Sequence, residues 1–161
     1  MSEIILKPIG IIHTPFKKTE GIPIQPNAGQ GIRGVIEVFN EFEAGLKDIE
    51  GFSHIILIYY FHLSKKFKLL SKPYMDDTER GVFAIRGPSR PNCIGISTVK
   101  LIKRENNVLF IEDLDIVDDS PLLDIKPYVP QFDTRDNVKI GWLEKKIHKL
   151  HETRDDGRFE K

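Results

Sequence analysis

The sequence predicts a mainly β (α+β) protein: a small β-barrel of short, largely antiparallel strands with a C-terminal helix. Apolar, β-branched stretches of strand length recur through most of the chain, whereas a long helical repeat occurs only near its end. No Gly-x-Gly-x-x-Gly segment follows a predicted strand, so a Rossmann fold is not supported. Many short strands followed by one terminal helix are typical of a small barrel or a curled sheet.

The strands are expected over 4–12, 32–39, 52–62, 81–86, 94–103 and 108–114. Pro8 breaks or bends the first segment, as an edge strand or a bulge allows. The third is a nearly continuous β-branched and aromatic run, which is typical of a strand buried on both faces. Asn106 and Asn107 separate the last two segments and favour a hairpin.

Two helices are expected, a short one over 42–49 and a longer one over about 138–153. In the longer segment Leu143, Ile147 and Leu150 share one face at positions i, i+4 and i+7. Residues 21–31 and 63–80 are expected to form loops, and no linker or repeat divides the chain. We therefore expect one domain over 1–161, with the barrel over about 4–133.

Composition and charge restrict the possible functions. The 24 Lys and Arg residues balance 24 Asp and Glu residues, which argues against non-specific binding of nucleic acid by charge alone. A local basic face remains possible around the lysines of 65–72. The single cysteine excludes an internal disulfide, and the longest apolar run, 55–61, is too short to cross a bilayer. These features predict a soluble, cytoplasmic protein.

The segment IRGPSRPNCIG, residues 85–95, combines two arginines, two prolines, two glycines and the only cysteine. A loop stiffened in this way and carrying Arg86 and Arg90 suits an anionic or planar ligand. The alternative is a hydrated turn whose arginines pair with nearby carboxylates. Cys93 would need a histidine base to act as a nucleophile, and no histidine spacing identifies one. We therefore interpret Cys93 as a small, partly buried turn residue.

Two further clusters carry candidate ligands. Glu144, His148 and His151 can share one face of the expected C-terminal helix, but no remote ligand completes a metal site, so no metal is predicted. Aspartates recur over 113–130, where the sequence DDSP at 118–121 predicts a turn that exposes carboxylates and backbone amides.

Five motifs in a fixed order together resemble the TsaA-like family, the TrmO-type tRNA methyltransferases. They are PIGIIHTPF, IPIQP, GLKDIEGFSHIILIYYFH, GVFAIRGPSRPNCIGIS and VDDSPLLDIKPYVPQFD, and they extend to about residue 133. The resemblance implies a dimeric β-barrel that binds S-adenosylmethionine outside the Rossmann fold. It also implies methylation of N6 of threonylcarbamoyladenosine beside the anticodon of tRNA. The alternatives are a non-catalytic module that binds S-adenosylmethionine or RNA, and a methyltransferase with a different substrate.

The resemblance further implies the residues of the site. The cofactor would be bound by Ile24, Gln25, Pro26, Asn27, Phe61, His62, Arg86, Ile96, Asp118, Asp119, Ser120 and Pro121. The accepting nitrogen is amide-like and a poor nucleophile until it loses a proton, so Asp118 or His62 would serve as the base. Positioning without a base is the alternative. Phosphates of the tRNA would be bound by Arg90, Lys65, Lys66 and Lys68.

Two positions depart from the usual family pattern. The family usually has proline where Cys93 stands, and its acidic turn is more often DGTP than DDSP, so Asp119 replaces a glycine. Both departures leave cofactor binding plausible in this chain.

Overall fold

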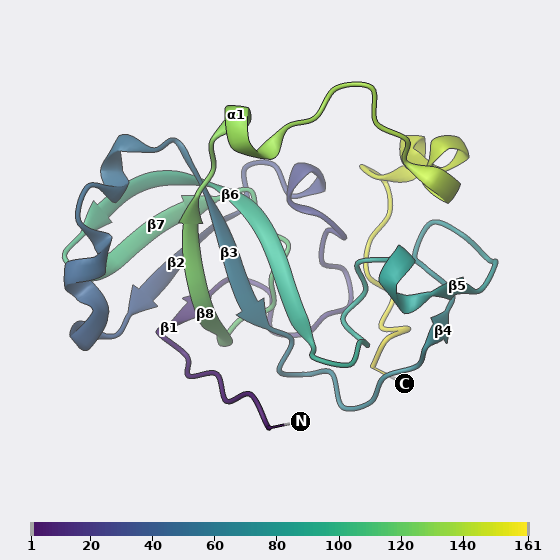
Figure 1. Cartoon of the computed structure of the whole chain (residues 1–161), viewed down its shortest axis with the longest axis horizontal. Helices are drawn as coiled ribbons and strands as arrows, with labels where there is room; N and C mark the ends of the chain where they lie inside the picture. Colours follow the sequence, from purple (N-terminus) through teal and green to yellow (C-terminus); the bar gives the residue numbers. More distant parts are fainter. Residues whose placement is uncertain (1, 161) are drawn as a thin grey trace.

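The centre of the computed structural model, which describes residues 2–160, is a closed barrel of six strands (Figure 1). Around the barrel the order is β1 (Gly10–His13), β2 (Arg33–Val38), β7 (Val108–Glu112), β6 (Ile94–Glu105), β3 (His54–Tyr60) and β8 (Ser120–Pro127). Each strand pairs with its neighbours in antiparallel fashion, and β8 closes the sheet onto β1. The predicted fold class, a small antiparallel barrel, is confirmed.

Alternate residues of these strands fill the barrel interior, as the period of two in a strand requires. The fully buried members are Ile12, Ile36, Ile55, Leu57, Val99, Leu109 and Leu122, each with 0% of its surface exposed. In β3 the side chains between these buried positions are only partly buried. The expectation that this strand is buried on both faces was wrong, because a closed barrel gives each strand only one interior face.

Several strand boundaries differ from those expected. Residues 2–9 are not in a strand, and Ile4 and Ile5 are 85% and 77% exposed. The strand expected over 81–86 is replaced by the short β5 (Arg80–Gly81), paired with β4 (Leu70–Ser71), and by the 3-10 helix η4 (Val82–Ala84). Strand β8 was not expected, because prolines and aspartates are rare in strands, but Pro121 lies near the strand's start, where proline is tolerated.

The helices are also shorter than expected. In place of a helix over 42–49 the chain forms the 3-10 helices η2 (Asn40–Leu46) and η3 (Ile49–Gly51). A further 3-10 helix, η1 (Pro26–Ala28), lies in the loop between β1 and β2. No described helix is long and apolar enough to cross a membrane.

The continuous helix expected over 138–153 is not formed. After α1 (Pro130–Asp133), the segment contains only the 3-10 helices η5 (Gly141–Lys145) and η6 (Ile147–Lys149). Gly141 starts η5 with φ +57°, and the indole N–H of Trp142 donates to the carbonyl oxygen of Ala84 at 2.9 Å. The apolar side chains that suggested the helix line a cavity against the rest of the chain, so tertiary packing overrides the helical repeat.

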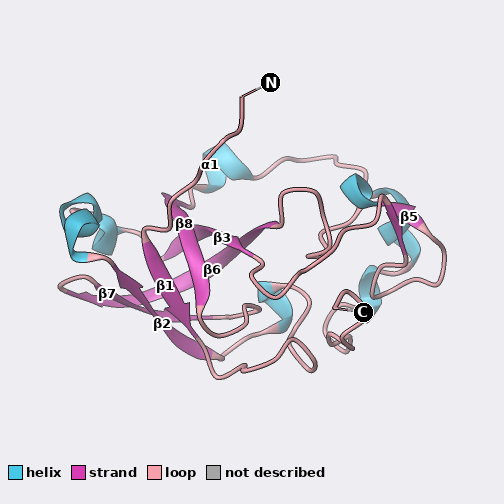
Figure 2. Cartoon of the chain, turned by 90° about the horizontal axis from the view of Figure 1, so that it is seen from below, coloured by secondary structure: helices cyan, strands magenta, loops and turns pink. Residues whose placement is uncertain are grey.

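A lobe of loops and short elements lies beside the barrel (Figures 1 and 2). This loop lobe consists of residues 62–91 and 134–160. The end of the chain connects the lobe internally and to the β1–β2 loop. The ring of Phe159 packs edge-on against Tyr74 with 5.0 Å between centroids, and the N–H of Gly21 donates to the carbonyl oxygen of Asp155. A Cβ on Gly87 would lie 2.8 Å from the ring of Phe159, so a larger residue here would require that ring to move. These contacts hold the lobe next to the edge of the barrel where β3 ends and β6 begins.

Candidate functional site

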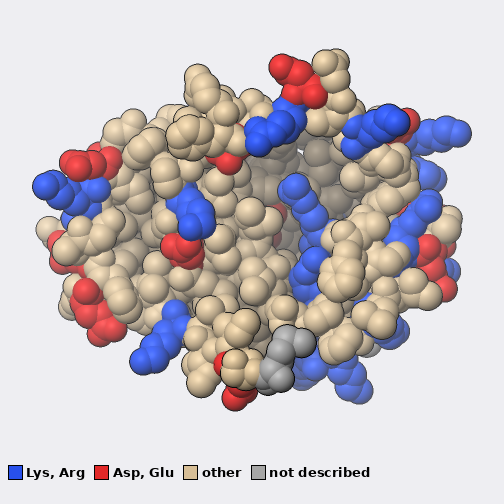
Figure 3. All heavy atoms as spheres, in the orientation of Figure 1, with Lys and Arg blue, Asp and Glu red and all other residues tan. Residues whose placement is uncertain are grey.

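A cleft separates the barrel from the loop lobe. It contains two cavities of about 390 and 710 Å3. Both are lined by Ile24, Gln25, Tyr74, Phe83, Arg86 and Ile96, so the cavities adjoin. Figure 3 shows the surface hollowed there, with Lys and Arg side chains at the edge of the hollow. Cavities of this size accommodate a cofactor or a drug-sized ligand.

A hydrogen bond between Arg86 and Gln25 spans the cleft. Nη1 of Arg86 donates a hydrogen bond of 3.2 Å to Oε1 of Gln25, although 61 residues separate the two in sequence. Phe83 and Ile96 line the same two cavities as this pair and are 79% and 52% exposed. An accessible guanidinium between apolar walls suits a ligand that has both a flat ring and an anionic group.

Four further residues expected at the cofactor each line one of the two cavities. Pro26 and Asn27 line the larger cavity, and Phe61 and Ser120 line the smaller one. Phe61 packs edge-on against the ring of Tyr59 at 5.3 Å, and its N–H donates to the carbonyl oxygen of Cys93 at 2.8 Å. The structure therefore brings together most of the residues that the sequence motifs suggested.

His62 does not line either cavity, but its ring carries a buried polar atom without a partner. Within the described part of the chain no group hydrogen-bonds to Nδ1 of His62 or to the nearby Oγ of Ser64. Buried polar atoms are rarely left unpaired in a folded protein. The end of β3 therefore offers hydrogen-bonding capacity that the protein itself does not use.

A polar chain that was not predicted from the sequence lies at the floor of the smaller cavity; its members Ser97 and Tyr59 are buried and Asp115 is partly exposed. Oγ of Ser97 donates a 2.6 Å hydrogen bond to Oδ1 of Asp115, and the hydroxyl of Tyr59 lies 3.1 Å from the same Ser97 oxygen. Burial raises the pKa of Asp115 to about 7, although Ser97 and Arg86 oppose this shift. Two features of the sequence could have indicated this chain: the polar Ser97 stands at an inward position of β6, and Asp115 stands between the buried apolar residues Leu114 and Ile116.

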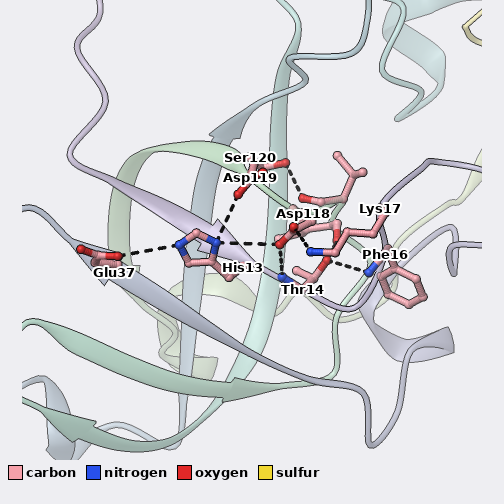
Figure 4. A network of polar contacts seen from close by, with 10 residues as sticks. His13, Thr14, Phe16, Lys17, Glu37, Asp118, Asp119 and Ser120 are labelled. Carbon is pink, nitrogen blue, oxygen red and sulfur yellow. Dashed lines mark hydrogen bonds and ion pairs between the residues drawn. The ribbon is translucent and has the colours of Figure 1, made fainter.

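The DDSP turn is held by residues that directly follow the neighbouring strand β1 (Figure 4). Oδ1 of Asp118 accepts a hydrogen bond of 2.8 Å from the N–H of Thr14, and its Oδ2 forms an ion pair with Lys17. Burial opposes ionisation of Asp118, but the hydrogen bonds from Lys17 and Thr14 outweigh it and lower the pKa of Asp118. Its carboxylate is thus bound within the protein and does not line either cavity.

The next residue of this turn, Asp119, is exposed and lies 3.3 Å from Nδ1 of His13. Its φ of +60° is in the left-handed region, which glycine favours and aspartate tolerates. This explains how an aspartate can stand where glycine is usual in the family. Pro121 pairs with Ile11 in β8, so Ser120 is the only member of the DDSP turn that lines the cavities described above.

The candidate metal ligands of the sequence analysis do not converge. Among residues 2–160, the one group of His, Cys, Asp and Glu side chains with ligand atoms within 4.8 Å of one another is His13, Asp118 and Asp119, and not Glu144, His148 and His151. The ammonium group of Lys17 already neutralises Asp118 in that group.

The expected RNA-binding residues lie beside the cleft. Lys65, Lys66 and Lys68 are exposed, and the hydroxyl of Ser89 donates to the carbonyl oxygen of Lys66 at 2.6 Å. This bond joins the lysine segment to the arginine-containing loop 85–95. Arg90 points into that loop, where its Nη1 donates to the carbonyl oxygens at positions 85 and 87. Arg90 therefore braces the loop in this structure.

Cys93 ends the loop in a left-handed conformation, with φ +48°. Its thiol donates to the carbonyl oxygen of Arg90 at 3.2 Å, and it does not line either cavity. Proline, the usual family residue here, is fixed near φ −65° and cannot adopt this conformation. The loop backbone at position 93 therefore has a shape that proline does not permit.

Comparison with known proteins agrees with the five motifs. Residues 11–134 match the family described as the tRNA-methyltransferase O N-terminal domain. A probable S-adenosyl-L-methionine-binding protein of Pyrococcus abyssi is 62% identical over 97% of this chain and 85% of its own length. The tRNA (adenine(37)-N6)-methyltransferase of Homo sapiens is 34% identical over 84% of this chain and 32% of its own length. The chain thus spans about a third of that human relative.

The fold agrees with solved structures. The crystal structure of TrmO from Pseudomonas aeruginosa matches with a TM-score of 0.74 and 34% sequence identity. That match covers 88% of this chain and 63% of the solved one.

Proposed function

Because the chain belongs to the family of the tRNA-methyltransferase O N-terminal domain, we propose that it is an S-adenosylmethionine-dependent methyltransferase acting on N6 of adenine in tRNA. Relatives named as tRNA (adenine(37)-N6)-methyltransferases and as S-adenosyl-L-methionine-binding proteins support this proposal. The single observation that carries it is the contact between Arg86 and Gln25, which joins two motifs of the family across the cleft.

The residues of the cleft fit S-adenosylmethionine. Its carboxylate requires a cation, which Arg86 supplies, and its adenine requires flat apolar contacts, which Phe83 and Phe61 supply. Nδ1 of His62 is buried and has no partner within residues 2–160, and His62 lines neither cavity, so it binds a polar group of the cofactor only if its ring turns toward the cleft. The walls of the cleft are formed by Ile24, Pro26, Asn27, Ile96 and Ser120. The other residues of the DDSP turn, Asp118, Asp119 and Pro121, adjoin Ser120 and hold it in place.

When bound, S-adenosylmethionine supplies an electrophilic methyl group on a cationic sulfur. Transfer of that group is an in-line displacement, so the protein contributes mainly by holding the adenine nitrogen on the line of attack. The nitrogen must also lose a proton. Asp118 and His62 are the sequence-derived candidates for the base; Asp118 reaches the cleft only if it exchanges its contacts with Thr14 and Lys17.

The proposal extends to substrate and assembly. The substrate is the threonylcarbamoylated adenosine beside the anticodon, whose splayed bases are typical targets of specific RNA recognition. Lys65, Lys66 and Lys68 bind phosphates of the tRNA beside the cleft, and Arg90 contributes by shaping the loop. Two copies of the chain form a dimer, which would place the basic loop of one copy beside the cleft of the other. The protein acts as one domain in the cytoplasm, where tRNA is modified.

Two measurements test the proposal in order. Calorimetric titration with S-adenosylmethionine is expected to show binding at micromolar concentration. Incubation with tRNA that lacks the methyl group, followed by mass spectrometry of its nucleosides, is expected to add one methyl group to adenosine at a single position. Substrates with and without the threonylcarbamoyl group establish which form is used. Binding without methylation would indicate a non-catalytic binding protein, and absence of binding would refute the proposal.

A further inference from the structure

Two carboxylates line the smaller cavity, Asp115 and Asp155, and they are held in different ways. Asp155 lies on the C-terminal segment, where its Oδ1 accepts a hydrogen bond of 2.7 Å from the N–H of Gly157. Asp115 lies in the connection between β7 and β8, directly between the buried residues Leu114 and Ile116. Of the two, Asp115 is the one bound by a side chain of a barrel strand, and it shares the cavity with Phe61 and Arg86, which we assign to the cofactor.

The side-chain hydrogen bond to Asp115 comes from a barrel strand. Ser97, which is 2% exposed, binds Oδ1 of Asp115, and Tyr59, which is 3% exposed, lies within hydrogen-bonding distance of Ser97. Ser97 and Tyr59 lie on the adjacent strands β6 and β3. A side chain held by such a buried chain has a fixed orientation, which proton transfer requires.

We propose that Asp115 accepts the proton of the adenine N6 nitrogen during methyl transfer, and that Ser97 and Tyr59 position it. This inference rests on the proposed function. As the nitrogen forms its bond to the methyl carbon, the bond from that carbon to sulfur breaks and its electron pair remains on sulfur. The N–H electron pair stays on nitrogen, and the proton passes to a carboxylate oxygen of Asp115 and then to water.

The charges around Asp115 suit this role. The titratable groups that share its cavity are Arg86 and Arg90 from the loop 85–95, Tyr59 from β3, and Tyr74 and Asp155 from the loop lobe. Burial raises the pKa of Asp115 to about 7, and Arg86 limits the rise. A base with a pKa close to neutral is ionised at working pH and still accepts a proton efficiently.

The test compares Asp115→Asn with a matched control, Asp124→Asn. Asp124 belongs to the same acidic segment, but its side chain is 45% exposed, pairs with Lys126 and does not line either cavity. Asp115→Asn is expected to bind S-adenosylmethionine with unchanged affinity by calorimetry and to methylate tRNA at least about 100-fold more slowly. Asp124→Asn is expected to match the wild type in both measurements.

A second variant separates proton transfer from a merely structural role. Ser97 donates to the ionised form of Asp115, so Ser97→Ala is expected to raise the pH at which kcat/KM reaches half its maximum. Isotope-edited infrared titration of the carboxyl group, without any ligand, is expected to show the same upward shift.

The possible failures are distinguishable. Wild-type protein that neither binds S-adenosylmethionine nor methylates tRNA refutes the proposed function and this inference with it. An active wild type refutes the inference alone in either of two cases: Asp115→Asn remains within tenfold of its activity, or Ser97→Ala leaves the pH profile unmoved.

Discussion

Replacement of Asp115 by asparagine is expected to stabilise the protein at alkaline pH. The pKa of Asp115 is about 7 in the folded protein, against 3.8 for an unperturbed carboxyl. The native state therefore binds more protons than the unfolded chain between these values, and the free energy of unfolding falls as the pH rises through this window. Above pH 7 the carboxylate is charged in the folded protein, and its burial then lowers the free energy of unfolding by the full amount. Asparagine is neutral and avoids this cost, while its carbonyl oxygen still accepts the bond from Ser97.

The magnitude follows from the two pKa values. At about 1.4 kcal/mol for each pKa unit, the shift from 3.8 to about 7 corresponds to about 4 kcal/mol. Asp115 retains some contact with solvent in the cleft, which reduces the expected gain to about 2 to 4 kcal/mol at pH 8. Below the unfolded pKa both side chains are neutral, so the gain is expected to disappear as the pH falls toward 4.

Urea unfolding of the wild type and of Asp115→Asn, followed by circular dichroism from pH 4.5 to 8.5 in steps of about half a unit, measures this gain. The other carboxyl groups titrate in both proteins and cancel in the difference. Asp124→Asn, changed at an exposed aspartate, is expected to show no such pH-dependent gain. A difference between Asp115→Asn and wild type that is zero at pH 8, or that is constant over the whole range, refutes the raised pKa.

The remaining predictions concern the cleft and its surroundings. Arg86→Ala is expected to remain folded by circular dichroism and to bind S-adenosylmethionine about 10- to 100-fold more weakly, because a hydrogen bond to a charged group is lost; unchanged affinity contradicts the assignment. Cys93→Ser is expected to retain most activity, whereas a thousandfold loss would indicate a covalent nucleophile. Cys93→Pro is expected to lose about 3 kcal/mol of stability in urea unfolding; equal stability would show that the loop accepts φ −65°. Changing Lys65, Lys66 and Lys68 together to alanine is expected to weaken tRNA binding and flatten its salt dependence without altering cofactor affinity, and normal binding at every salt concentration would place the RNA elsewhere.

The sequence predicted those barrel strands in which apolar and polar residues alternate with a period of two. Strands β2, β3, β6 and β7 are rich in β-branched residues and alternate with a period of two, and they lie close to the expected ranges. Strand β8 was missed because Pro121 and Asp124 are poor strand residues, yet β8 is paired on both sides and closes the barrel. Pairing with two neighbouring strands outweighs the low strand propensity of these residues, and the sequence of the segment alone does not reveal that it has two partners.

The site was predictable to the extent that it is encoded in continuous motifs. Gln25 and Arg86 each belong to a distinctive Pro- or Gly-containing segment, and the structure brings these two residues into contact. The chain of Tyr59, Ser97 and Asp115 has no such signal, since the members are 38 and 18 residues apart and each is an ordinary residue in its own strand or turn. The pairing of β3 with β6, and the path of the chain between β7 and β8, bring them together at the floor of the cleft.

The two departures from the family pattern are of one kind, although they look unrelated in the sequence. Cys93 introduces a thiol and Asp119 a charge, but both residues have positive φ, at +48° and +60°. At Asp119 the usual glycine favours the same region, so the turn keeps its backbone and only the side chain is new. At Cys93 the usual proline excludes that region and also lacks the N–H that here donates to the carbonyl oxygen of Arg90 at 3.1 Å. Differences in ligand binding from proline-containing relatives are therefore expected to originate in the loop 85–95, where the backbone must differ, and not in the DDSP turn.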